Sequence, residues 1–372
     1  PRVESIRGVV DLETAGGTLD VQGQYRLVHR GSAPVSEMLI SFEPDLELMT
    51  LERRDDWKER HDAAGSMGPL GALSGHAGTS PGTWHLVFDP PLAVGETTYL
   101  AFALRLAPGG WGRRPTERWL RRNGSFLLGG TGTHEFFQGA QIFPKLGYDA
   151  ARELRSTRDR QRHGLPPWSP ALTPEAFTEG ASQVPQPEDR ADVDLWIHAA
   201  SDEVALGPGD LLERTVADGR SRHHYVCKEA IPAMFPIVCG RYEVSLGRAG
   251  DVELEVYHAP GHGARVPHIL WAIQRSLAYF EAQWGPYPHR VLRVAEAPGG
   301  ATFACSFPTL MAFAEGMAFT QPKGDGGPIP WDGHEAAHAV DPLLWLVAHE
   351  VAHQWWNGQV VAAPALGAEL IS

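Results

Sequence analysis

The hydrophobic residues of this chain change their spacing near residue 244, and this change is the strongest constraint on its fold. Before that point, apolar and polar residues alternate in segments such as TLDVQGQYRLVHRG, TWHLVFD and TTYLAFALRLA, with glycine and proline between the segments. Alternation with a period of two places the apolar side chains on one face of a β-strand. We therefore expect residues 1–243 to form an N-terminal β-rich domain of antiparallel sheets, saddle-like or sandwich-like in form.

From residue 244 onward the chain combines strands with helices. Residues 266–284 have apolar side chains at the spacing of an amphipathic helix, which Gly285 and Pro286 end. Strands are expected before this helix in DVELEVYHAPG, and after it in HRVLRVAEA and TLMAFAEGMAF. This order predicts that residues 244–372 begin a second domain, so that the whole chain has an α+β fold. A length of 372 residues also favours two domains over one.

Composition and charge exclude several kinds of partner. The chain has 32 Lys and Arg against 45 Asp and Glu, so we expect no nucleic-acid partner. The arginine-rich residues 113–122 are interpreted as a solvated face. No apolar run approaches the roughly 18 residues of a membrane span, so the segment itself is expected to be soluble. Because it starts at Pro1 and ends at Ser372 directly after an apolar segment, we expect it to be a fragment of a longer protein.

Two further features concern loops and cysteines. Residues 61–82 and residues 166–187 lack periodicity and are expected to be surface loops. Three cysteines are too few for a disulfide framework and have no C-x-x-C spacing, although a bridge between Cys227 and Cys239 is possible.

The pattern His-Glu-x-x-His occurs twice, at residues 334–338 and at residues 349–353. It binds a metal only on a helix, where histidines four residues apart project from one face with the glutamate nearby. The first copy has room for about two helical turns, because Asp341 precedes a proline and is pushed out of the helical region. The first copy is therefore interpreted as a chance match on a loop.

The second copy has signals for both ends of a helix. Asp341 is the expected N-cap, Pro342 the first helical residue, and Asn357-Gly358 a left-handed stop, which leaves about four turns between them. Apolar residues surround most of this helix, which predicts burial. Two buried imidazoles and a carboxylate would cost several kcal/mol, and a divalent cation would compensate. The metal ligands are therefore predicted to be His349 and His353, with Glu350 as catalytic base. The alternative is a pair of core histidines bonded to backbone carbonyls.

Zinc in a hydrolase takes three protein ligands and leaves the fourth position for water, so a third ligand is needed. A metzincin would have a histidine six residues after His353, but Gln359 stands there, which excludes that class. The remaining common arrangement uses a glutamate on a following helix. Glu369 is the only acidic residue left in the chain. No role is expected for four other histidines in strand or turn contexts: His223, His224, His258 and His262.

The segment VAHEVAHQWWNGQVV resembles the zinc helix of the membrane alanyl aminopeptidase family, whose motif is H-E-x-x-H-x-W, and Trp355 matches its tryptophan. IFPKLGYDAARELRSTRDRQRHGLP, YEVSLG and FACSFPTLMAFAEG further resemble a bacterial branch in which such a domain is fused behind an ABC-transporter permease. The similarity covers most of residues 120–372. It implies a gluzincin zinc metallopeptidase, the first half of a thermolysin-like catalytic domain in residues 244–372, a Zn²⁺ cofactor, a peptide substrate and a membrane-associated full-length protein.

The resemblance also implies what differs in this chain. The family's third ligand would fall at Ser372 or just beyond it, with Glu369 as the alternative, so the 372 residues alone are expected to bind zinc weakly and to be nearly inactive. The family's Gly-x-Met-Glu-Asn strand holds the amino terminus of the substrate, and Cys305, Ser306 and Phe307 occupy its last three positions. The amine anchor is thus missing, although the backbone of this strand can still hold an extended peptide. The alternative function is a non-catalytic peptide-binding or sensing domain attached to a membrane transporter.

Overall fold

The computed structural model describes most of the chain up to residue 360. The described residues are 1–15, 17–44, 46–55, 71–78, 81–106, 134–138, 142–147, 154, 156–167, 190–233, 235–297, 304–320 and 341–360. The arginine-rich run at residues 113–122 and most of the loop expected at residues 166–187 lie outside these ranges. No helix in the described part of the chain has the length and apolar character needed to cross a membrane.

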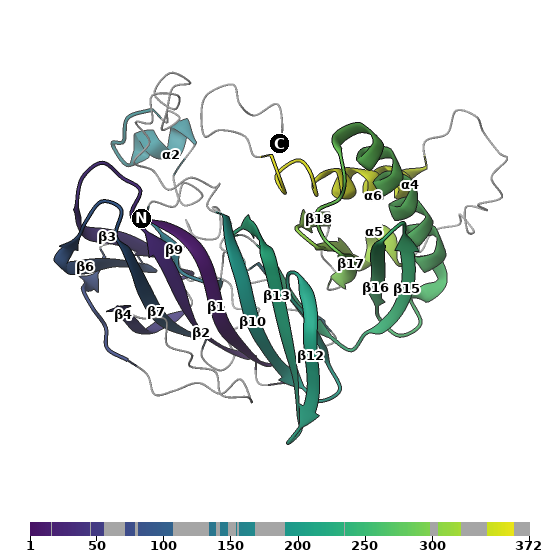
Figure 1. Cartoon of the computed structure of the whole chain (residues 1–372), viewed down its shortest axis with the longest axis horizontal. Helices are drawn as coiled ribbons and strands as arrows, with labels where there is room; N and C mark the ends of the chain where they lie inside the picture. Colours follow the sequence, from purple (N-terminus) through teal and green to yellow (C-terminus); the bar gives the residue numbers. More distant parts are fainter. Residues whose placement is uncertain are drawn as a thin grey trace.

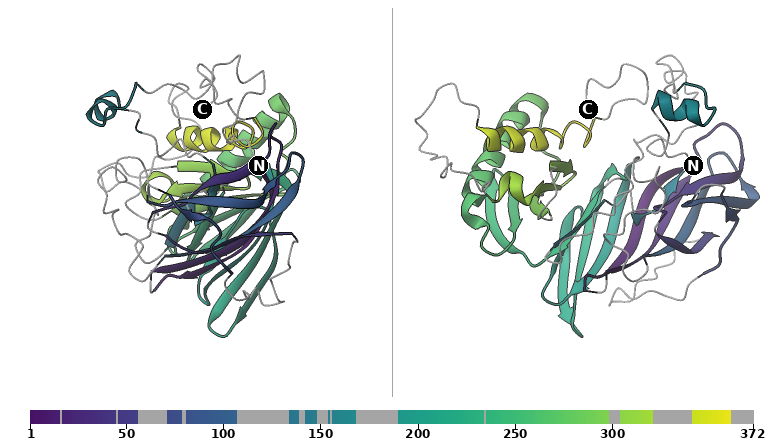
Figure 2. Two further views of the ribbon diagram at one scale, coloured as in Figure 1. Left: turned by 90° about the vertical axis from the view of Figure 1, so that its left-hand side faces the viewer. Right: turned by 180° about the vertical axis from the view of Figure 1, so that it is seen from behind.

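A seven-stranded sheet forms the largest layer of the molecule (Figures 1 and 2). Its strands, in spatial order, are β12 (Asp210–Ala217), β13 (Arg220–Pro232), β10 (Arg190–Ala200), β1 (Arg2–Glu13), β2 (Thr18–Val28), β7 (Thr97–Leu106) and β4 (Glu47–Arg54). β1 and β10 pair in parallel, so the prediction of purely antiparallel sheets is wrong. Alternating hydrophobicity determines which face of a strand is buried, but strand direction depends on the long connection that returns the chain beside β1.

Two smaller sheets accompany this layer. One contains β5 (His76–Ala77), β6 (Thr83–Leu92), β3 (Val35–Ser41) and β9 (Lys145–Leu146); the other contains β11 (Val204–Leu206), β14 (Pro236–Gly240) and β8 (His134–Gln138). A short helix, α2 (Thr157–Arg162), follows β9. The loop predicted at residues 61–82 is wrong in part, because β5 pairs with β6. Such a short strand gives no periodic signal, and its pairing partner alone determines it.

The remaining elements form an α/β unit. They are β15 (Glu243–Ala249), β16 (Val252–His258), a 3₁₀ turn (Gly263–Arg265), α4 (Val266–Trp284), β17 (Val291–Ala297), β18 (Ala304–Phe307), β19 (Leu310–Ala314), α5 (Glu315–Ala318) and α6 (Pro342–Ala352). The helix predicted at residues 266–284 is confirmed by α4. The strand predicted from TLMAFAEGMAF is wrong in its second half, since the chain turns into α5 at Glu315.

The five-stranded sheet of this unit has the order β15-β16-β17-β19-β18, in which β16, β17 and β19 are parallel. One face packs against α4 and α6 through a shared apolar core. The other face packs against β11 and β14. Leu206 of β11 and Val238 of β14 form one buried apolar cluster with Ala295 and Leu310 of the sheet. The division into domains at residue 243 stays a prediction. The sheet begins at Glu243, but this buried cluster joins residues from both sides of the division.

Buried polar contacts also connect the unit to the seven-stranded sheet. Arg293 of β17 is buried, donates to the carboxylate of Glu255 at 2.7 Å and donates to the carbonyl of Gly209 at 2.5 Å. The backbone N–H of Gly209 donates in turn to the hydroxyl of Thr309 at 2.8 Å. Because a buried arginine is tolerated only when it is paired, these contacts hold β17 and the β18–β19 hairpin at one position on the larger sheet.

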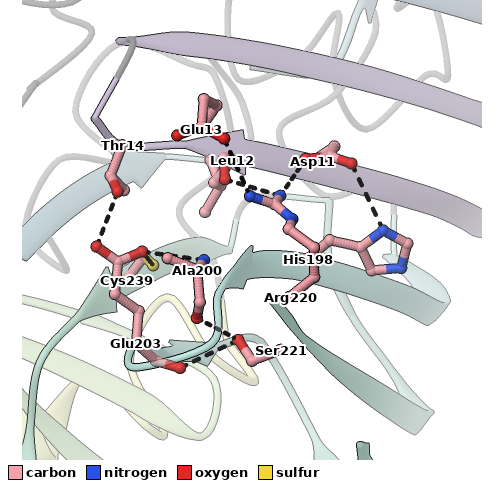
Figure 3. Close-up of polar contacts among 10 residues, drawn as sticks. All are labelled: Asp11, Leu12, Glu13, Thr14, His198, Ala200, Glu203, Arg220, Ser221 and Cys239. Carbon is pink, nitrogen blue, oxygen red and sulfur yellow. Dashed lines mark hydrogen bonds and ion pairs between the residues drawn. The ribbon is translucent and has the colours of Figure 1, made fainter. Parts of the chain in front are cut away.

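A second polar network joins β1 to the residues around β11 (Figure 3). The carboxylate of Glu203 is buried and accepts from the hydroxyl of Thr14 at 2.8 Å, the N–H of Ala200 at 3.3 Å and the thiol of Cys239 at 3.6 Å. Three donors satisfy a group that would otherwise be costly to bury. Cys239 and Cys227 are both free thiols, so the disulfide considered between them is not formed.

Candidate metal centre

Helix α6 begins where the sequence predicts. The carboxylate of Asp341 accepts from the N–H groups of Leu343 at 3.0 Å and Leu344 at 3.2 Å, while Pro342 occupies the first turn. These bonds satisfy two of the N–H groups that a helix start leaves without partners. The same carboxylate also contacts Nε2 of His268 at 2.7 Å, which fixes the start of α6 against the start of α4.

The helix ends earlier than predicted. It spans Pro342–Ala352, 11 residues, so that His353 is its C-cap. The N–H of Gln354 bonds to Val351 at 3.0 Å, a three-residue step that tightens the chain into a turn. Asn357 then adopts a left-handed φ of 72°, which confirms the predicted stop. The prediction of about four helical turns is wrong, because it assumed that α-helical bonding continues up to this stop.

The predicted burial of this helix and of both its imidazoles is also wrong in part. Leu343, Leu346, Val347 and Val351 pack into the core, but Trp345 is 62% exposed and His349 is exposed beside it. The indole of Trp345 stacks over the imidazole of His349, with ring centroids 5.8 Å apart. The helix is therefore amphipathic. The apolar residues on which the predicted burial rested are buried or half-buried, but the face that carries His349 is not covered, since hydrophobicity alone does not show which faces a neighbouring element covers.

The two histidines of the second copy lie together on this helix. Their Nε2 atoms are 3.3 Å apart and their rings are perpendicular, with an interplanar angle of 89°. Two nitrogen ligands bound tetrahedrally to zinc at about 2.0–2.1 Å lie about 3.3 Å from each other. The pair therefore fits two adjacent positions around a tetrahedral ion.

The surroundings of His353 favour the form that binds a metal. Its Nδ1 lies 3.2 Å from the carbonyl of Trp356, which can only accept, so Nδ1–H donates and Nε2 keeps its lone pair. Burial and the nearby ring of His349 lower the pKa of His353, and the carbonyl of Trp356 offsets only part of this. A neutral imidazole oriented by a backbone carbonyl is the usual state of a zinc-binding histidine.

Glu350 lies on the side of α6 that faces the sheet. It is 4% exposed, and burial raises its pKa to about 7. The pKa of the Cys305 thiol on β18 is raised mainly by burial and further by the charge of Glu350. The carboxylate and the edge strand therefore lie close enough to influence each other. A carboxylate with a pKa near neutrality is suited to accept and release a proton.

Gln354 holds the end of α6 to the β18–β19 hairpin, a role that was not predicted from the sequence. Its amide nitrogen donates to the hydroxyl of Ser306 at 2.7 Å and the carbonyl of Phe307 at 2.9 Å. Its amide oxygen accepts from the N–H of Thr309 at 3.2 Å and the hydroxyl of Tyr287 at 3.4 Å. All its hydrogen-bonding positions are thus used. The available signal was a polar residue between His353 and an apolar tryptophan.

Trp355, which the sequence resemblance matches to the tryptophan of H-E-x-x-H-x-W, is a packing residue. It is buried among the rings of Phe280, Trp284 and Tyr287, and its Nε1 donates to the carbonyl of Gly285 at 3.2 Å. These contacts join the end of α6 to the end of α4. They fix the position of the turn that carries His353.

The other predicted site residues are placed as follows. Cys305, Ser306 and Phe307 lie on β18, the edge strand of the five-stranded sheet. Glu369, Ser372 and the first His-Glu-x-x-His copy at residues 334–338 lie outside the described residues. Within the described part of the chain, the two imidazoles belong to no group of three potential metal ligands. The third ligand therefore stays a prediction.

Among the comparisons with known proteins, only the one with solved structures gives a match. No protein-family model and no curated protein matches the chain. Among solved structures, the crystal structure of Legionella pneumophila aminopeptidase A in complex with aspartic acid is similar with a TM-score of 0.60 and 15% sequence identity. The match covers 97% of this chain and 35% of that one, so the chain spans about a third of its length. At this identity the similarity concerns the fold alone, and this chain shares its fold with part of an aminopeptidase.

Proposed function

We propose that the chain is the metal-binding part of a zinc-dependent metallopeptidase of the gluzincin class, similar to the membrane alanyl aminopeptidases. His349 and His353 hold the ion and Glu350 is the general base. The 3.3 Å separation of the two Nε2 atoms carries the proposal, because it matches the separation of two zinc ligands. The fold shared with an aminopeptidase supports it.

The three residues divide the work of hydrolysis. A zinc ion at this position would supply a Lewis acid that polarises the scissile carbonyl and makes water a better nucleophile. Glu350 accepts a proton from the attacking water and donates it to the leaving amine. Its burial raises its pKa to about 7, and a nearby dication would lower this value again. The hydrogen bond from Nδ1 of His353 to the carbonyl of Trp356 fixes the ring so that its Nε2 lone pair would be available to hold an ion.

The third ligand is proposed to be a glutamate downstream of the described residues. Glu369 is one candidate, and the first residue after Ser372 in a longer natural protein is the other. Zinc hydrolases use three protein ligands and leave one position open, so two imidazoles alone bind weakly. A permease segment in the same natural protein and association with a membrane belong to the same proposal.

The substrate is proposed to be a peptide bound along β18. This strand is at the edge of its sheet, where backbone groups can pair with an added strand. Gln354, in the turn that follows α6, donates a hydrogen bond to the hydroxyl of Ser306 and so fixes the position of β18 relative to α6. Specificity is expected to differ from that of family members that bind a free amino terminus, because Cys305, Ser306 and Phe307 provide no carboxylate.

A second candidate function is a non-catalytic peptide-binding or sensing domain. The absence of a carboxylate among the residues of β18 favours it, since binding through the backbone requires no amine anchor. It gives no reason for Glu350, whose buried carboxylate is costly to maintain.

The test compares the natural protein with its Glu350→Gln variant in a zinc-dependent peptide hydrolysis assay. The variant is expected to lose about 10²- to 10⁴-fold in kcat. Glu213→Gln, at an exposed position of β12, is the matched control and should retain full activity. Equal hydrolysis by wild type and Glu350→Gln would refute the proposed chemistry. Peptide binding without hydrolysis in the zinc-loaded wild type would establish the second candidate function instead.

A further inference from the structure

Three side chains of the kinds that bind metals, none of them from the His349 and His353 pair, lie close together at the carboxyl ends of the parallel strands. His262 follows β16, Glu296 is the second-last residue of β17, and Glu315 directly follows β19. One nitrogen of His262 and one carboxylate oxygen from each glutamate lie within 4.8 Å of one another. Because the three strands are adjacent and parallel, their carboxyl ends meet at one edge of the sheet. Ligand sites in open α/β sheets occur at this edge.

Glu296 is the unusual member of this cluster. It is 0% exposed, and it lies on the face of β17 that packs against the helices, in line with Leu292 and Val294. One of its oxygens accepts from the N–H of Ala259 at 2.7 Å, and the other contacts Nδ1 of His262 at 2.6 Å. Within the described residues, its ion pairing involves no lysine or arginine. A buried carboxylate beside a second carboxylate therefore has only an imidazole to offset two negative charges.

The donor set indicates the class of ligand. Two carboxylates and one imidazole suit a first-row divalent transition metal such as Zn²⁺ or Mn²⁺. Calcium and magnesium prefer oxygen ligands alone. The three groups belong to three separate segments of the chain, and a bound cation would join the ends of these segments.

Two other clusters of the described residues are weaker candidates. Glu37, His76 and His85 lie on β3, β5 and β6, where the first two are exposed. Cys227, Glu229 and His289 include a thiol that already donates to a backbone carbonyl at 3.4 Å. Only the cluster at the strand ends combines a fully buried carboxylate with ligands from three separate segments.

We propose that His262, Glu296 and Glu315 form a second divalent transition-metal site, which joins the carboxyl ends of β17 and β19 to the turn before α4. This site does not depend on the proposed peptidase activity. The ion neutralises the two carboxylates and leaves further coordination positions for water. It stabilises the α/β unit at the edge where β19 ends in α5.

The experiment measures zinc bound per chain by equilibrium dialysis and elemental analysis, with buffered free Zn²⁺ as the only probe. The background is the double variant His349→Ala/His353→Ala, which removes the first pair of ligands. In this background we expect one Zn²⁺ per chain. Adding Glu315→Gln or His262→Ala should raise the dissociation constant for Zn²⁺ by at least about tenfold. Asp251→Asn, at an exposed turn residue, is the control and should leave binding unchanged.

The outcomes separate the two proposals. No zinc in the background variant, or zinc that is indifferent to both Glu315→Gln and His262→Ala, would overturn the second site. Loss of one zinc between wild type and the background variant reports on the first site independently. Glu315 is partly exposed at a helix start, so its amide variant should fold. Circular dichroism of each variant checks this, and His262→Ala provides the same test from a different segment.

Discussion

Replacing Gln354 by leucine should destabilise the α/β unit strongly, although no charge or large volume is lost. The side chain is 2% exposed and makes four hydrogen bonds, two of them with the backbone groups of Phe307 and Thr309. Leucine would leave the buried N–H of Thr309 without a partner, at a cost of about 1–3 kcal/mol. It would also remove one of the hydrogen bonds accepted by the carbonyl of Phe307, which stays paired with Leu310 across the turn. Burial of the leucine side chain returns part of this, so we expect the free energy of unfolding to fall by about 3 kcal/mol.

The assay is urea unfolding monitored by tryptophan fluorescence, since Trp355 adjoins the substituted residue. In a thermal melt the same loss should lower Tm by about 6–12 °C. Zinc affinity at His349 and His353 should weaken in parallel, because the turn that carries His353 loses its attachment to β18. Gln274→Leu is the matched control: Gln274 makes one hydrogen bond on an exposed face, to the carbonyl of Arg248, and its loss should change stability by less than about 0.5 kcal/mol. A change below about 1 kcal/mol for Gln354→Leu would refute the reasoning.

Further predictions concern pH, a helix cap, an aromatic anchor and the metal. Burial lowers the pKa of His223 from 6.5 to about 4, and neither ring nitrogen has a well-formed hydrogen bond, although the carbonyl of Ile197 slightly favours the charged form. The unfolded chain therefore binds a proton that the folded chain does not, so this contribution to stability is complete above pH 6.5 and decreases as the pH falls. About 3 kcal/mol should be lost by pH 4, and urea midpoints measured against pH should show a smaller loss in His223→Gln. Asp341→Ala removes two hydrogen bonds to backbone N–H groups and should cost about 1–2 kcal/mol in the same assay, with Asp341→Asn intermediate. Trp355→Ala should cost about 3–5 kcal/mol because a buried aromatic side chain is lost, and Trp355→Phe should cost clearly less. Chelation should abolish peptide hydrolysis by the natural protein, and added Zn²⁺ should restore it; hydrolysis that survives complete metal removal would contradict the proposed function.

The features predicted correctly from the sequence depend on residues that are close together in the chain. The limits of α4 follow from its apolar spacing and from Gly285, which has a positive φ of 97°. The start of α6 follows from Asp341 and Pro342, whose effects act within one helical turn. The separation of His349 and His353 follows from their spacing of four on a helix that ends at the second of them.

The features predicted wrongly depend on contacts between distant segments. The parallel pairing of β1 with β10 depends on the path of the chain between them. α6 ends at Ala352, where Gln354 turns toward β18, a strand that lies about 50 residues earlier in the chain. The exposure of His349, which was predicted to be buried, depends on which helix face the sheet and α4 cover.

The sequence by itself determined the local elements and the spacing of potential ligands along one helix, because hydrogen bonds and periodic burial act over a few residues. Only the tertiary structure decided which distant side chains meet. Glu296 appears in the sequence as one charged residue in an apolar strand, and His262 as an ordinary turn residue. Parallel strand pairing brings both to the end of β19, beside Glu315, and burial gives their charges an energetic consequence that no local pattern contains.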